Sequence, residues 1–259
     1  MISSAYIVPH PPIIIPGIGQ PDDLKKAEKT ISAMEKLGTE LEKEHPDAIL
    51  LVSPHAQMNH HTFVINSAPK LAGSFIDFGL DMDFEFENDV DLIEEIVSAA
   101  NDKNIPVHLH ESFLDHGTLT PLYYLAKTIK PKLVQLAFSM MDYQKHYEYG
   151  KLIGGVLRGS RKKIAVVASG DLSHRLISSA PAGYSPKGKD FDEKLIKLLS
   201  GKNVKGILNL DENLIEEAGE CGLRSIIVIL GILNEKYEFD ILSYEGPFGV
   251  GYLTASLMP

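Results

Sequence analysis

The chain has 259 residues, of which 44% are hydrophobic and 23% charged, and a formal net charge of −10. This composition is typical of a soluble globular protein with a sizeable core. The acidic balance argues against a nucleic-acid partner, because phosphate contacts need clustered lysine and arginine. No apolar run approaches the roughly 20 residues that span a bilayer. The single cysteine excludes an internal disulfide and suits a reducing compartment, so we expect a cytoplasmic protein.

Apolar runs and helical periods alternate along the first half of the chain. The run that ends at Val8 predicts a buried strand, and Pro21 opens a helix whose apolar positions continue to Leu41. Strands are expected around 48–53, 62–67 and 105–110. An amphipathic helix is expected over 90–103, and the acidic, phenylalanine-rich stretch 74–89 is expected to be an extended excursion over the surface.

The second half continues the same alternation. Helices are expected over 119–130, 143–158, 188–200, 202–217 and 223–235, and strands over 132–139, 163–169, 239–244 and 249–257. Strands that alternate with helices predict a layered α/β fold. No Gly/Ser linker or charge block marks a boundary, so residues 1–259 are expected to form one domain.

Three histidines stand where apolar strands end. They are His10 between prolines, His55 after Ser-Pro, and His174 at the end of Ser-Gly-Asp-Leu-Ser-His. In open α/β sheets, ligands bind in the crevice beyond the carboxyl ends of the strands. A turn or capping role would explain one such histidine, but three together favour a functional site. We therefore expect His10 and His55 to bind metal or take part in catalysis.

A fourth histidine opens a predicted helix. Asp115 or a nearby threonine can cap that helix, but capping does not account for His116, whose imidazole Asp115 could orient. His60 and His61 are adjacent, so in an extended chain they point different ways. For this pair we expect at most a secondary substrate contact, from His61.

His174 follows Ser173 directly, which is an awkward arrangement for a serine nucleophile and its base. The sequence also lacks the Gly-x-Ser-x-Gly elbow of serine hydrolases. General acid/base catalysis by His174 is therefore the better hypothesis.

With one cysteine, any metal must be held mainly by imidazole and carboxylate, which suits iron, manganese, zinc or copper. The carboxylate is open between Glu220, which could equally cap the following helix, and Glu245, which follows a strand. Cys221 could bind metal as a thiolate or be an inert buried thiol. Two histidines and one carboxylate form the ligand set of non-haem Fe(II) oxygenases.

Four motifs in chain order resemble the class III extradiol ring-cleavage dioxygenases, the superfamily of the protocatechuate 4,5-dioxygenase catalytic subunit and of the Memo proteins. They are Val8-Pro-His-Pro-Pro12, Ser53-Pro-His55, Asp115-His-Gly117 with Pro121-Leu122, and Ser169-Gly-Asp-Leu-Ser-His174. The resemblance implies a three-layer α/β/α fold with a central mixed, largely parallel sheet. It also implies cleavage of a catechol-type ring by Fe(II) and O₂, in a homo-oligomer or with a small accessory subunit.

The resemblance also suggests roles for individual residues. His10, His55 and Glu220 would be the metal ligands, His174 the acid/base residue for the catechol proton, and His116 a catalytic neighbour of substrate and oxygen. Asp115 and His61 are expected to contact substrate, with a ring-stacking wall from Phe63, Phe113, Tyr123 or Tyr184. The segment from Cys221 to Arg224 is closer to the Memo-like branch, some members of which lack the carboxylate.

Two alternative functions therefore stay open at the level of sequence. One is a Memo-like metal-binding or interaction protein without ring-cleaving activity. The other is a zinc-dependent hydrolase that uses the same histidines.

Overall fold

A single eight-stranded sheet runs through the computed structural model, which describes residues 1–258. The four central strands β7, β2, β8 and β1 are parallel to one another, and antiparallel pairs join β3 to β7, β10 to β1 and β9 to β10. This confirms the expected α/β class with a mixed, largely parallel sheet. The strand order is β6 (Val107–His110), β3 (Phe63–Asn66), β7 (Lys132–Ala137), β2 (Ala48–Ser53), β8 (Ile164–Ser169), β1 (Ile2–Val8), β10 (Tyr252–Met258), β9 (Glu238–Glu245).

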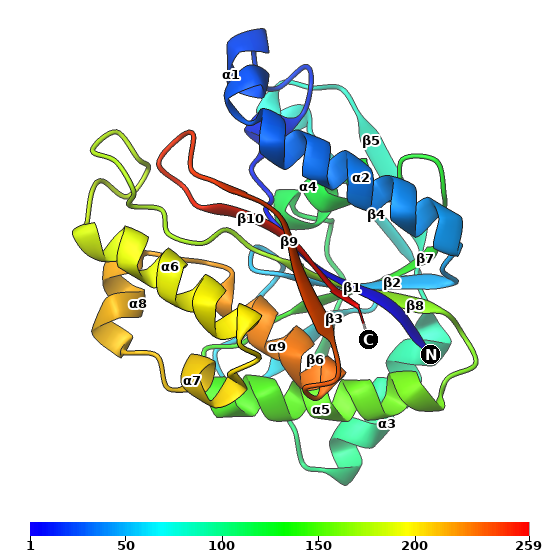
Figure 1. The fold of residues 1–259 in the computed structure, drawn as a ribbon. Helices are drawn as coiled ribbons and strands as arrows, with labels where there is room; N and C mark the ends of the chain where they lie inside the picture. The colour runs from blue at the N-terminus through cyan, green and yellow to red at the C-terminus, as the bar shows by residue number, and fades with distance from the viewer. Residues whose placement is uncertain (259) are drawn as a thin grey trace.

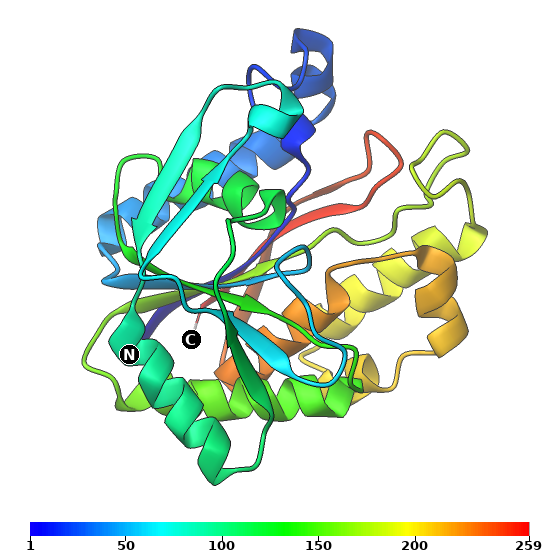
Figure 2. The same cartoon turned by 180° about the vertical axis from the view of Figure 1, so that it is seen from behind.

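Helices cover both faces of this sheet, as Figures 1 and 2 show from opposite sides. On one face lie α1 (Pro21–Lys26), α2 (Glu28–Glu44) and α4 (His116–Leu125). On the other lie α3 (Val90–Asp102), α5 (Tyr143–Gly159), α6 (Pro186–Ser200), α7 (Val204–Leu208), α8 (Glu212–Ala218) and α9 (Leu223–Leu233). Each face has its own apolar core, because the central strands are buried on both sides. No helix within residues 1–258 combines the length and the apolar character needed to cross a membrane.

The surface excursion expected at 74–89 is more regular than predicted. The strands β4 (Lys70–Ser74) and β5 (Asp83–Glu87) pair antiparallel, and the 3-10 turn η2 (Ile76–Phe78) connects them. The reason lies in the alternation of β5, in which Phe84 and Phe86 pack on the core while the acids between them face water. We call this hairpin, residues 70–87, the β4–β5 arm.

Other differences arise at caps. The helix expected from Pro21 to Leu41 is divided at Ala27 into α1 and α2. The helix expected over 202–217 is two helices, because the side chain of Asp211 accepts a hydrogen bond from the Leu214 amide and starts α8 anew. Asp115 likewise starts α4 three residues earlier than predicted, at His116.

Glycines allow α5 and α9 to pack with their backbones in contact. A methyl carbon built on Gly150 would lie 2.1 Å from the carbonyl oxygen of Val228, and one on Gly154 would lie 2.3 Å from that of Ile232. From the facing helix, Gly231 approaches the carbonyl of Tyr147 in the same way. Gly155, next to Gly154, has no atom within 4 Å of such a carbon. The crossing therefore depends on particular glycines.

His146 on α5 is fully buried between the rings of Phe63 and Phe138. Its Nδ1 lies 2.8 Å from the carbonyl oxygen of Asp142, and its Nε2 lies 3.1 Å from the carbonyl oxygen of Ser139. Burial lowers the pKa of His146 from its ordinary value of 6.5 to about 4. A proton therefore binds the unfolded chain between these pH values but not the folded one.

We expect this histidine to make the protein less stable as the pH falls from 6.5 towards 4. The sign follows from linkage, because the unfolded state binds more protons in that window and gains free energy from them. Denaturant unfolding of wild type and His146→Gln at pH 7 and pH 4 measures the effect. The wild type should lose about 2 kcal/mol more than the variant between the two pH values. Parallel pH dependence of the two proteins would contradict this assignment.

Candidate metal centre

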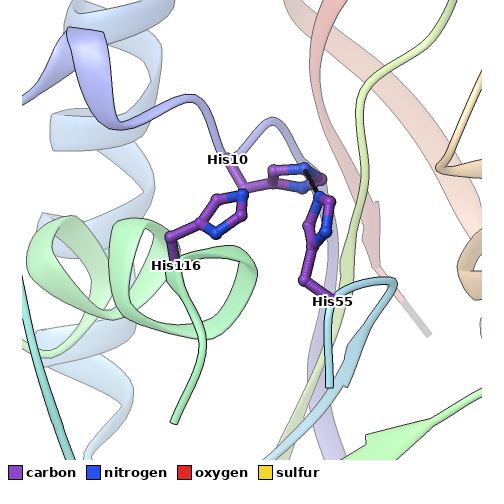
Figure 3. Close-up of side chains that lie close together, drawn as sticks. All are labelled: His10, His55 and His116. Atoms are coloured by element: carbon purple, nitrogen blue, oxygen red, sulfur yellow. Dashed lines mark hydrogen bonds between the residues drawn. The ribbon is translucent and has the colours of Figure 1, made fainter. Parts of the chain in front are cut away.

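Three loops that carry histidines leave the sheet at the same edge. β2, β8 and β1 are parallel neighbours, and they end at Ser53, Ser169 and Val8. After each of these strands, the backbone turns out of the sheet within two or three residues. This places His10 and His55 opposite each other across the end of β8, with their ring planes at 88°, and the start of α4 brings His116 to them (Figure 3).

His10 is only 2% exposed. Hydrogen bonds hold it in position and determine which of its ring nitrogens carries the proton. Its backbone N–H donates to Asp171 Oδ1 at 3.1 Å, and its Nδ1 lies 3.1 Å from the hydroxyl of Ser169. The single hydroxyl proton of Ser169 is donated to the carbonyl of Gly117. The hydroxyl must therefore accept from His10 Nδ1–H, which leaves Nε2 as a bare lone pair.

That lone pair points at a second imidazole. His10 Nε2 and His55 Nε2 are 3.1 Å apart. Two nitrogen ligands at about 2.0–2.1 Å from one ion, in neighbouring positions, are separated by about 3.0–3.4 Å. Burial and the neighbouring histidines lower the pKa of His10 well below its ordinary value, so the ring stays neutral. A metal site requires imidazole nitrogens that converge on one point, and the positions of these two nitrogens fit one.

His116 completes the first group of possible ligands. Its ring centroid lies 4.2 Å from that of His55 and 5.7 Å from that of His10. One nitrogen from each of the three histidines falls within 4.8 Å of the others. Burial, and then the nearby His55, lower the pKa of His116 to about 4, which again favours a neutral ring at pH 7.

Asp115 caps α4, the helix that begins at His116. Its Oδ1 accepts from Ser53 Oγ at 2.6 Å and from the Thr118 amide at 3.1 Å, while its Oδ2 accepts from Gln135 Nε2 at 2.8 Å and from the Thr118 hydroxyl. Four donors therefore occupy the carboxylate that we expected to contact substrate. The substrate contact stays a prediction, and what the structure shows for Asp115 is a helix cap tied to β2 and β7.

Gly117 lies where this network meets the histidines. A methyl carbon there would lie 2.6 Å from Ser53 Oγ, 2.8 Å from Asp115 Oδ1 and 3.2 Å from the His55 ring. We expect Gly117→Ala to weaken metal binding by about 10–100-fold, the range seen when groups that orient ligands are disturbed. Metal titration checks this prediction. Gly159→Ala, at an open position in α5, is the control, and equal metal affinities in the two variants would contradict the prediction.

A carboxylate and a thiol lie on the other side of His10. Asp171 Oδ2 and Cys221 Sγ are each 3.8 Å from His10 Nε2, and the three residues form a second group within 4.8 Å. Gly170 and Gly222 bring the loop after β8 against the start of α9, since a methyl carbon on Gly170 would lie 2.2 Å from Gly222 Cα. Burial raises the pKa of Asp171 to about 6 and that of the Cys221 thiol well above its ordinary value. A bound cation would favour both anions instead.

His174 stands next to this second group. Its Nε2 faces Asp171 Oδ2 at 3.9 Å, and its Nδ1 is buried with no hydrogen-bond partner within residues 1–258. The loop is held by Ser173, whose amide donates to buried Asp192 and whose hydroxyl donates to the carbonyl of Ala218. The three strand-end histidines and His116 thus lie around one centre.

A family model described as the catalytic LigB subunit of aromatic ring-opening dioxygenase matches residues 4–255. The chain belongs to the LigB family. This confirms the resemblance to the class III extradiol dioxygenases, over nearly the whole chain.

Individual relatives are more distant. "Protein CA_C1420" of Clostridium acetobutylicum is 34% identical over 97% of this chain, but the chain spans only 56% of that protein's length. A 3,4-dihydroxyphenylacetate 2,3-dioxygenase of Escherichia coli is 25% identical over 76% of the chain and 78% of its own length. A 2-aminophenol 1,6-dioxygenase beta subunit of a Pseudomonas species is 23% identical over 84% of the chain and 80% of its own.

The fold is also found in a solved structure. The crystal structure of protein JW3007 from Escherichia coli K12 matches with a TM-score of 0.72 and 20% identity, over 98% of this chain and 99% of that one. At this identity, the likeness concerns the fold alone.

Within this LigB-family site, the structure uses both glutamates elsewhere. Glu220 Oε2 accepts from the Leu223 amide at 2.6 Å and so caps α9, and burial raises its pKa to about 7. Glu245 Oε1 accepts from the amide and hydroxyl of Thr30 on α2, at 2.8 and 2.7 Å. Neither belongs to the two groups of possible ligands found within residues 1–258, so metal ligation by Glu220 stays a prediction.

The substrate contact expected of His61 stays a prediction, and Asp171 is a residue of the centre that the sequence analysis did not select. His61 is exposed on the loop after β2, where its amide donates to Asn59 and its ring neighbours His60. Sequence reasoning did not select Asp171, although it stands three residues before His174 in the motif that was singled out. That spacing, on a loop beyond a strand end, was the available signal.

Proposed function

We propose that the chain is an Fe(II)-dependent extradiol dioxygenase, which cleaves the ring of a small aromatic diol with O₂. The observation that carries the proposal is the approach of His10 Nε2 and His55 Nε2 to 3.1 Å, with His174 beside them in a LigB-family chain. The dioxygenase names of two relatives support the same class of reaction. The diol itself is not specified by these observations.

Each residue of the centre has a role that follows from its position. His10 and His55 would hold the ion, with His116, Asp171 or Cys221 within reach as further ligands. Bound iron supplies a Lewis acid that eases loss of hydroxyl protons, and a redox partner for O₂. His174 Nε2 accepts the proton of a substrate hydroxyl and returns one later in the reaction. Asp171 Oδ2 lies 3.9 Å from that nitrogen.

A second candidate is a Memo-like metal-binding protein without ring-cleaving activity. The observation that favours it is the position of Cys221, 3.8 Å from His10 Nε2, while Glu220 caps α9. A thiolate ligand suits softer metals than a carboxylate does. The third hypothesis, a zinc-dependent hydrolase, would use the same histidines. A serine mechanism gains no support, because the Ser173 hydroxyl is buried and donates to the carbonyl of Ala218.

The decisive experiment is anaerobic reconstitution with Fe(II), followed by exposure of the protein to O₂ and a set of catechols. The proposal expects a yellow ring-cleavage product from at least one catechol, with consumption of O₂. The zinc-loaded protein is the control, since zinc has no redox chemistry. Stoichiometric iron without any product would favour the second candidate.

The third ligand is tested by two neutral replacements at neighbouring positions. If Glu220 binds the ion, Glu220→Gln should remove iron; if Cys221 does, Cys221→Ser should remove it and Glu220→Gln should not. Gln can still accept the hydrogen bond of the Leu223 amide, so α9 keeps its cap. Iron content after anaerobic gel filtration distinguishes the outcomes.

Assembly and location extend the proposal. A homo-oligomer, or a complex with a small accessory subunit, is expected, and one relative is named as a beta subunit. A cytoplasmic location is expected from the single cysteine and the reduced iron that the activity needs.

A further inference from the structure

An aromatic side chain from the β4–β5 arm lies beside the histidine cluster. Phe78, in the turn η2, has its ring centroid 5.4 Å from that of His116 with the planes at 62°. Phe78 is 40% exposed, so part of its ring faces open space next to the site. The arm lies alongside α4 (Figure 2), and Gly73 packs against Leu119 of that helix.

The arm is fixed by contacts that do not involve Phe78. The Leu114 amide donates to the carbonyl of Ala72 at 2.8 Å, and Gly73 packs so closely on Leu114 that a methyl carbon would lie 2.8 Å from it. Phe75 is fully buried against Phe84, with centroids 5.6 Å apart. Phe78 is therefore held beside His116 by the rest of the arm, while its own ring stays partly uncovered.

The other aromatic residues expected to form a substrate wall have different surroundings. Phe63 is buried in the opposite core, stacked on Tyr149 at 4.0 Å. Tyr123 packs against Tyr124, and Phe113 is 83% exposed in a groove with Asp77 and Lys130. Of the aromatic residues within 1–258, Phe78 is the one whose ring pairs with a histidine of the cluster.

We propose that Phe78 is the specificity-determining wall of the site, against which the flat ring of the substrate packs. The proposal rests on the proposed function, and it assigns to Phe78 the contact with the ring of the aromatic diol. Aromatic pairs prefer edge-to-face or offset arrangements with centroids about 4.5–7 Å apart. A ring whose oxygens face His10 and His55 meets Phe78 on the His116 side of the centre.

The test measures binding, with the metal present and no turnover. Protein loaded with Zn(II) is titrated with 4-nitrocatechol, whose visible spectrum changes on coordination, and separately with acetohydroxamate, a chelator without a ring. Phe78→Ala should lower the affinity for 4-nitrocatechol by roughly tenfold and leave the affinity for acetohydroxamate within about twofold of wild type. Phe78→Leu, which keeps apolar area but has no ring, should fall between alanine and wild type.

Ile76→Ala is the matched control, because Ile76 lies in the same turn and is 59% exposed. It should bind both ligands as wild type does. The inference is overturned if Phe78→Ala binds 4-nitrocatechol normally, if it loses both ligands equally, or if the zinc-loaded wild type binds no 4-nitrocatechol. Failure of the iron-loaded wild type to cleave any ring, with Phe78-dependent binding intact, would overturn the proposed function and leave this inference standing.

Discussion

Replacing His10 by alanine is expected to weaken metal binding by more than about 100-fold, beyond the loss caused by groups that only orient ligands. His10 is the one residue shared by both groups of possible ligands, the three histidines and the set with Asp171 and Cys221. Its removal also leaves the Ser169 hydroxyl without its donor. Metal content after anaerobic loading and desalting measures the effect.

Two further variants separate ligation from folding. His55→Ala removes an exposed partner of His10 and should lose the metal with little change in stability. His61→Ala, another exposed histidine on the same loop, should keep the metal. Full metal retention by the His10→Ala/His55→Ala double variant would remove the basis of the proposed site.

Opposite effects are expected from two adjacent glycines of α5. Gly154→Ala should destabilise the protein by about 3 kcal/mol, because its methyl carbon would lie 2.3 Å from the carbonyl oxygen of Ile232 and force α9 away. Gly155→Ala has open space around the same atom and should stabilise the helix by about 0.5–1 kcal/mol. Denaturant unfolding of both variants tests the pair.

Both substitutions replace glycine by alanine in α5 and raise the helix propensity equally. Each is therefore the control for the other. Destabilisation of both to the same extent would show that α5 tolerates no alanine for reasons other than contact with α9. Equal stabilisation would mean that the two helices are farther apart than the structure has them.

The sequence predicted where in the fold a functional site could lie. It did not predict which side chains contact one another there. His10 and His55 could be found because parallel strands end at one edge of a sheet. The orientation of their nitrogens depends on the Ser169 hydroxyl and the Gly117 carbonyl, which come from elements far apart in sequence. Glu220 was the expected third ligand because it precedes a helix, and for the same reason it serves as a helix cap.

For the fold, periodicity gave the strands of the sheet and the longer helices. The β4–β5 arm was missed because its acidic composition was read as a surface excursion, although Phe84 and Phe86 alternate with period two. Phe78 was not among the predicted wall residues for a related reason. Only the fold shows that the arm lies alongside α4, with Phe78 next to His116.

Residues of the metal centre are far apart in the sequence, and this separation determines when the centre can form during synthesis and folding. His10 and Cys221 lie 211 residues apart, and β1 must pair with both β8 and β10 before the edge of the sheet is complete. Contacts this distant form late, because loop closure must precede them. On a ribosome, His10 is synthesised 211 residues before Cys221, so the centre cannot be complete until that stretch has been made. Metal binding is therefore expected after these segments have been synthesised. A ribosome-bound chain that ends before β8 should contain no metal ion.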